Sequence, residues 1–128
     1  MYCYRDLKVW QVSMEMVMDI YKDSESFPKS ELYALTSQIR QCAVSIPSNI
    51  AEGSGRSSTK EFIRFLSIAN GSLSEFETQL EIAHRLGYLS DTNTYQSKIS
   101  QLRSMLKGLI NSLANKLKPT LSSGNRND

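Results

Sequence analysis

The chain has 128 residues, which is enough for one domain with a buried core and too few for two. Apolar residues make up 40% of it and charged residues 22%, as in ordinary soluble globular proteins, which argues against a disordered or membrane-embedded chain. No run of 18 apolar residues is present, the N-terminal MYCYRDLKVW is charged too early for a secretory signal, and Cys3 and Cys42 are isolated. We therefore expect a reduced, cytoplasmic protein with no membrane contact.

Charge is unevenly distributed along the sequence. Residues 1–97 carry nine Lys/Arg and twelve Asp/Glu, a net charge of −3. Residues 98–128 carry six Lys/Arg and one Asp, a net charge of +5. This asymmetry indicates contact with a polyanion or with an acidic neighbouring subunit, and a solvated basic helix face is the alternative.

The first predicted helix covers residues 7–21. Apolar residues recur there at steps of three and four, the period of one helix face. Phe27-Pro28 ends the pattern, because the residue before a proline is pushed out of the helical conformation. The stripe consists of Leu7, Trp10, Met14, Val17 and Tyr21, widened by Val9, Val12, Met16 and Ile20.

A second helix is predicted from about Ser30, a candidate N-cap with Glu31 in the first turn. Gly53 and Gly55 can end this helix, because glycine is common at helix C-termini. Its apolar face consists of Leu32, Leu35, Ile39, Cys42, Ile46 and Ile50.

Pro47 lies inside the second helix, where it removes one hydrogen bond and kinks the axis. Ser45, Asn49 and Glu52 follow at steps of four and three, so they share a face near the kink. We interpret them as a structural polar network that satisfies freed backbone groups or fixes helix register. A polar binding site is the alternative.

The stretch SIPSNIAEGSGRSSTKEF, residues 45–62, joins the second helix to the third. It is neither a P-loop nor a dinucleotide-binding loop, because it lacks the required glycine spacing and a preceding strand. Ser58-Thr59-Lys60-Glu61 instead predicts a capping box that opens the third helix. Arg56, Lys60 and Arg64 cluster at this helix start, a favourable place for a phosphate.

The third and fourth helices have the most regular patterns. The third is about 28 residues long, roughly 42 Å, and ends at Leu86-Gly87. Pro119 closes the fourth. Their apolar seams are Phe62, Leu66, Ala69, Leu73, Phe76, Leu80 and Ala83, then Tyr95, Ile99, Leu102, Leu106, Leu109 and Leu113. Ile63, Phe65 and Ile68 widen the third seam, which favours a partner helix outside the monomer.

Four amphipathic helices with short connections predict an all-α protein, an antiparallel up-and-down four-helix bundle with shallow left-handed crossings. We place the bundle domain at residues 1–118 and a flexible C-terminal tail at residues 119–128.

The strings QIRQCAVSIPSNIAEGSGRSS and EFIRFLSIANGSLSEFETQLEIAHRLGYL closely resemble the bacterial 23S rRNA intervening-sequence protein family. The likeness covers roughly residues 4–117 and departs at Gln41, where family members commonly have a second basic residue beside Arg40. The resemblance implies four-helix bundles that assemble into homopentamers, many of them encoded inside insertions of the large ribosomal RNA gene. The related accessory variability determinant proteins form basic pentamers that bind nucleic acid and a reverse transcriptase, a role that applies here only by analogy.

Catalytic and metal chemistry have little support in the sequence. Glu81-x-x-His84 matches half of a di-iron carboxylate motif, but His84 is the only histidine, so the second half is absent. We therefore expect a non-enzyme with no metal, no cofactor and no small-molecule substrate, and read Glu81 and His84 as surface residues.

Two functional hypotheses remain. In the first, the chain is an oligomer that binds RNA or DNA through basic patches, with Tyr88 and Tyr95 the nearest aromatic residues in sequence for base stacking. In the second, it is an interaction scaffold whose basic fourth helix pairs with Glu75, Glu77 and Glu81 of a neighbouring subunit. The predicted nucleic-acid contacts are Arg103, Lys107, Lys116 and Lys118, with Arg56, Lys60 and Arg64 as a second patch.

Overall fold

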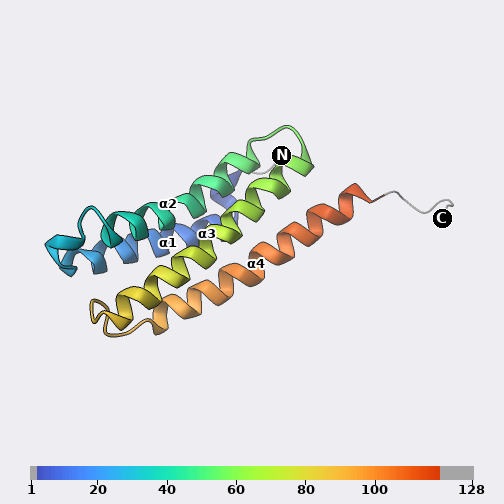
Figure 1. Ribbon diagram of the computed structural model, residues 1–128. Coiled ribbons are helices and arrows are strands. Elements are labelled where there is room, and N and C mark those ends of the chain that lie inside the picture. The colour runs from blue at the N-terminus through green and yellow to red at the C-terminus, as the bar shows by residue number, and fades with distance from the viewer. Residues whose placement is uncertain (1–2, 119–128) are drawn as a thin grey trace, which may run out of the picture.

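Four long helices carry most of the chain (Figure 1). The structure, a computed structural model, describes residues 3–118, so the predicted tail at residues 119–128 and Pro119 lie outside the described residues. Within residues 3–118 there is no strand and no helix long and apolar enough to cross a membrane. The long helices are α1 (Lys8–Asp23), α2 (Leu35–Ser54), α3 (Thr59–Arg85) and α4 (Asn93–Leu117), with short 3₁₀ segments at Tyr4–Asp6, Ser24–Ser26 and Lys29–Glu31.

Successive helices are antiparallel neighbours, and α4 returns to pack against α1 (Figure 1). Their apolar faces meet in one continuous core that runs along the bundle. This arrangement confirms the predicted all-α four-helix bundle.

The third predicted helix agrees with the structure in its whole seam and at both ends. All seven seam residues from Phe62 to Ala83 are buried. The Glu61 amide donates to the Ser58 hydroxyl at 3.1 Å, which is the predicted N-cap. At the other end Gly87 has φ +81°, and the amides of Gly87 and Tyr88 donate to the carbonyls of His84 and Ala83. These two bonds close a Schellman motif, so glycine at position 87 ends the helix.

In α1 the core face lies beside the predicted stripe. The residues that were expected only to widen the stripe, such as Met16 and Ile20, are fully buried. Tyr21, by contrast, is 42% exposed, and Trp10 is half-buried. Two overlapping apolar stripes have the same helical period, so only packing against α2 and α4 decides which faces the core.

The start of α2 differs from the prediction. Ser30 lies in a 3₁₀ turn, the helix begins at Leu35, and Leu32 is 46% exposed. The first turn of α2 is capped by Glu31, whose carboxylate accepts from the Leu35 amide at 3.3 Å. Tyr88 donates to the same carboxylate at 2.9 Å, so a contact from the α3–α4 connection holds the cap in place.

Gly53 does not end α2 but lies inside it, buried against α3. A Cβ atom at this position would come within 2.6 Å of the Phe65 Cβ and 3.0 Å of the Phe62 ring. Glycine is therefore required here by the close approach of two helices, and the C-cap is Gly55.

α1 and α4 are joined by polar contacts at one end of their interface. The Lys98 ammonium lies 2.6 Å from the Asp19 carboxylate and 3.7 Å from Glu15. The Tyr95 hydroxyl donates to Asp23 at 2.5 Å, while its ring packs edge-on against Phe76 in the core. These contacts fix the first half of α4 against the second half of α1.

Candidate functional site

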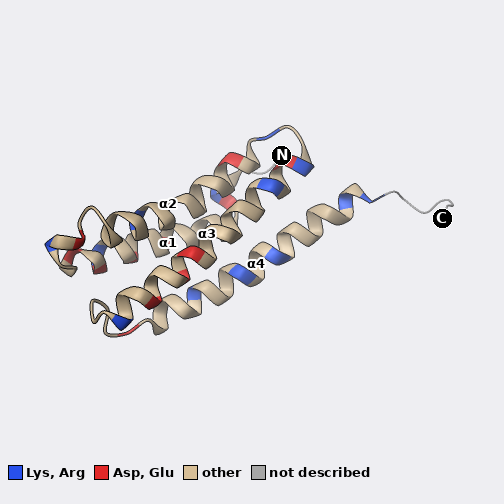
Figure 2. Ribbon diagram, in the orientation of Figure 1, with Lys and Arg blue, Asp and Glu red and all other residues tan. Residues whose placement is uncertain are grey.

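Lys/Arg and Asp/Glu occur at both ends of the bundle (Figure 2), but their balance differs between the two halves. One half of the bundle, which we call the basic end, contains residues 3–15, 45–72 and 106–118 and includes the α2–α3 turn. It carries eight Lys/Arg and four Asp/Glu, a net charge of +4. The other half of the described chain carries six Lys/Arg and eight Asp/Glu, a net charge of −2. The two halves of the folded bundle therefore differ in net charge, as do the two segments of the sequence.

The basic end brings the second predicted patch together with Lys107, Lys116 and Lys118 of the first, whereas Arg103 lies in the other half of the bundle. A hollow of about 300 Å³ lies where the α2–α3 turn meets the end of α4. Arg56 and Lys116 line it together with four hydroxyl side chains, above the apolar floor of Phe62 and Leu113. The hydroxyl residues are Ser54, Ser57, Ser58 and Thr59. Residues 60 positions apart in sequence therefore border one surface, and the exposed Lys60 and Lys118 belong to the same end.

Arg56 and Arg64 share one aromatic ring. Their guanidinium carbons lie 4.8 Å and 4.9 Å from the centroid of Phe65, within the range of a cation–π contact. Each is also paired with a carboxylate nearby on the chain, Arg56 with Glu52 at 2.6 Å and Arg64 with Glu61 at 3.4 Å. Both arginine side chains remain largely exposed, at 44% and 59%.

Arg103 and Lys107 lie apart from this cluster, along the groove between α3 and α4. Arg103 binds Glu77 at 3.0 Å and the Ser74 hydroxyl at 3.2 Å, both on α3 of the same chain. Lys107 is exposed, and both cations line a hollow of about 430 Å³. Arg103 therefore pairs inside its own chain with one of the acidic residues that was expected to meet a neighbouring subunit.

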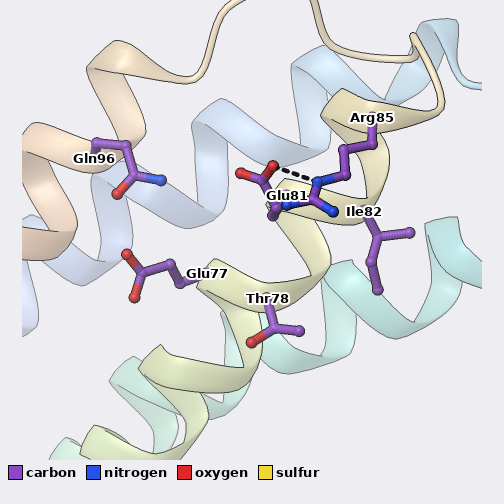
Figure 3. Close-up of a pocket in the computed structure, with 6 residues that line it drawn as sticks. All are labelled: Glu77, Thr78, Glu81, Ile82, Arg85 and Gln96. Carbon is purple, nitrogen blue, oxygen red and sulfur yellow. Dashed lines mark hydrogen bonds and ion pairs between the residues drawn. The ribbon is translucent and has the colours of Figure 1, made fainter.

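The groove continues toward the start of α4 as a second hollow of about 460 Å³ (Figure 3). Its charged lining is Glu77, Glu81 and Arg85. Arg85 is bound to Glu81 at 2.8 Å, and this hydrogen bond lowers the pKa of that carboxyl. An acidic hollow with its arginine already paired does not favour an anion.

His84 and Glu81 point to different partners. A His84 ring nitrogen (Nδ1) lies 2.9 Å from the Leu89 carbonyl, whereas Glu81 pairs with Arg85. Among residues 3–118 no group of three or more His, Cys, Asp or Glu side chains is placed to hold a metal ion.

The polar residues around Pro47 bond within their own helix. The Ser45 hydroxyl donates to the Cys42 carbonyl at 2.7 Å, and the Asn49 amide donates to the Ser45 carbonyl at 2.7 Å. Glu52 lies one turn further on, paired with Arg56. Two of the three grouped residues thus contact the backbone next to Pro47, and the third belongs to the arginine cluster.

Two basic residues of this end were not singled out from the sequence. Arg5 and Lys8 precede or begin α1, whose N-terminus lies at the end of the bundle that holds the α2–α3 turn (Figures 1 and 2). Arg5 also lies 5.6 Å from the ring centroids of Tyr4 and Trp10. Their charge was visible in the sequence, but their place beside the other cations depends on the antiparallel fold.

Comparison with known proteins gives one family. No curated protein matches the chain. The model of the family described as 23S rRNA-intervening sequence protein matches residues 5–108, which includes all of α1, α2 and α3 and more than half of α4. The chain therefore belongs to the 23S rRNA-intervening sequence protein family.

Proposed function

We propose that this chain is a non-enzymatic, cytoplasmic, oligomeric protein that binds nucleic acid through its basic end, in a role linked to rRNA intervening sequences. The observation that carries the proposal is the excess of cations at one end of the bundle, where Lys/Arg side chains from the N-terminal segment, α1, the α2–α3 turn, α3 and α4 outnumber Asp/Glu by eight to four. A polyanion neutralised by several Lys/Arg side chains releases its counterions, which is the main source of sequence-independent affinity.

The side chains at this end favour contact with phosphates over contact with bases. Tyr95 is buried and bonded to Asp23, and Tyr88 is bonded to Glu31 at the opposite end, so neither of the tyrosines considered for stacking serves the basic end. The hollow beside the α2–α3 turn offers hydroxyls and cations, which suit phosphate oxygens. A structured RNA read through its backbone is the expected ligand.

Fluorescence anisotropy with a labelled RNA hairpin, matched duplex DNA and single strands, each at several salt concentrations, tests the proposal. We expect binding to the hairpin that weakens steeply as salt rises. Lys60→Glu with Lys116→Glu should weaken it strongly. Lys22→Glu with Lys29→Glu makes the same change in net charge at the opposite end and should weaken it far less. Absence of binding by the assembled protein at low salt would overturn the proposal.

Assembly into a homo-oligomer, five-fold by family resemblance, is part of this proposal. Residues 41–51 of α2 and 65–74 of α3 contain no charged side chain, and these stretches face each other across the α2–α3 pair. Val44 and Ile68 within them are 37% and 40% exposed. An uncharged surface with exposed apolar groups suits contact between copies, and light scattering measures the mass of the assembly.

The scaffold hypothesis draws support from the same charge separation. A basic end of net +4 complements the other half of net −2, so copies can attract one another without nucleic acid. In that case rising salt would dissociate the assembly itself, which light scattering across the salt series detects.

A further inference from the structure

The least expected feature of the basic end is that two arginines converge on one ring. Arg56 comes from the α2–α3 turn and Arg64 from the second turn of α3, yet both guanidinium groups contact Phe65. Their like charges lie within about 10 Å of each other, a distance at which both attract the same anion. Phe65 itself is only 9% exposed and packs against Gly53, so the ring is a fixed support.

Both guanidinium groups form ion pairs with carboxylates of the same chain. The Arg56–Glu52 and Arg64–Glu61 pairs join residues four and three positions apart, and each carboxylate side chain is about half exposed. Exposed pairs of this kind are weak, typically worth a few tenths of a kcal/mol. A phosphate, which accepts paired hydrogen bonds from arginine in the same way as a carboxylate, can therefore replace them.

We infer that Arg56 and Arg64, supported by Phe65, form the principal phosphate-binding pair of the basic end, and that Glu52 and Glu61 compete with the nucleic-acid phosphates for them. The inference rests on the proposed nucleic-acid binding. It divides the predicted contacts into two groups. The pair on Phe65 sets affinity, while Arg103, which lies in the half of the bundle with net charge −2, contributes little.

The test measures anisotropy of the labelled RNA hairpin with the full chain. Arg56→Ala with Arg64→Ala should weaken binding about tenfold or more and lower the slope of log affinity against log salt by about 2. Arg56→Lys with Arg64→Lys keeps the charge but loses the planar fork and should fall between wild type and the alanine variant. Arg103→Ala should weaken binding less than threefold, since roughly one weak contact is lost.

Removal of the two competing carboxylates, Glu52 and Glu61, should increase the affinity for RNA. Glu52→Gln with Glu61→Gln is expected to tighten binding roughly three- to fivefold, because two weak ion pairs no longer have to be broken. Glu25→Gln with Glu81→Gln is the matched control, since it removes two negative charges from the acidic half of the bundle. Equal tightening by both variants would show a general charge effect and overturn the inference.

The outcomes separate this inference from the proposed function. If the wild-type chain does not bind the hairpin, the proposed function fails. If it binds with a steep salt slope but the double alanine variant binds equally well, only the role of the arginine pair fails. Circular dichroism of each variant checks that the bundle is intact, so loss of binding is not loss of fold.

Discussion

The interfaces α2–α3 and α1–α4 hold the same bundle together by different means. Between α2 and α3, Gly53 allows the Phe62 and Phe65 side chains to approach the backbone, and the Cys42 thiol reaches the Ser72 carbonyl at 3.1 Å. Between α1 and α4, polar side chains of the two helices contact each other: Lys98 is bound to Asp19, and Tyr95 is bound to Asp23.

Because the two interfaces differ in this way, their stabilities should respond to different kinds of substitution. A close helix pair responds to volume, because interiors are packed at crystal-like density and cannot absorb an added methyl group. A pair held by exposed or half-exposed ionic groups responds to charge, salt and single polar substitutions. Each interface can therefore be perturbed without changing the other.

The largest effect is expected from Gly53→Ala. The added Cβ would lie 2.6 Å from the Phe65 Cβ, so α2 and α3 must separate. We expect the free energy of unfolding to fall by about 2–3 kcal/mol. Urea denaturation followed by circular dichroism measures it, and an unchanged midpoint would show that the helices are not as close as described.

The α2–α3 interface is also expected to lose stability at alkaline pH, because it contains the buried Cys42 thiol. Burial, reinforced by the nearby Glu75, raises the pKa of the Cys42 thiol from its usual 9.0 to about 11. The folded state keeps this proton when the unfolded state has lost it, so the contribution is complete below pH 9 and is lost as pH rises from 9 to 11. The loss is on the order of 2 kcal/mol.

Cys42→Ala removes this titration. Its unfolding free energy should depend less on pH than that of the wild-type chain between pH 9 and 11. Parallel pH profiles for the two proteins would contradict the assignment to Cys42.

Smaller effects are expected at the α1–α4 contacts. Tyr95→Phe should lower the unfolding free energy by about 1–2 kcal/mol, because Asp23 loses its donor. Lys98→Met should lower it by about 1 kcal/mol or less, and the loss should shrink in high salt. The effect of Gly53→Ala should stay constant across the same salt series, which separates the two interfaces.

The smallest effect has the opposite sign and serves as the control for Gly53→Ala. Gly71 lies inside α3, and apart from its chain neighbours and the adjacent backbone of its own helix no atom lies within 4 Å of an added Cβ. Gly71→Ala should therefore raise the unfolding free energy by about 0.5–1 kcal/mol through helix propensity alone. A loss of stability would indicate that the Gly71 surface is covered in the oligomer, which light scattering on the variant would then reveal as dissociation.

Local chemistry explains which parts of the fold were readable from sequence. The α3 seam, the Ser58 cap and the Gly87 terminus depend on residues within a few positions of one another, so their pattern is complete in the sequence. The predicted start of α2 was wrong, because the first turn of this helix is capped by Glu31, which Tyr88 from the α3–α4 connection holds in place. The core face of α1 lies beside the predicted stripe, because the sequence contains two apolar stripes with the same helical period and does not show which one is buried.

At the candidate site, too, the sequence predicted local features but not contacts between distant segments. The sequence by itself determined the presence of four helices, both ends of α3 and the identity of every basic residue. Only the tertiary structure decided that Arg56 and Lys116 line one hollow, that Arg56 and Arg64 share the Phe65 ring, and that Arg103 is bound to Glu77. The physical reason is that helix periodicity fixes which residues share a face, whereas the register between antiparallel helices, set by packing at positions such as Gly53, fixes which charges meet.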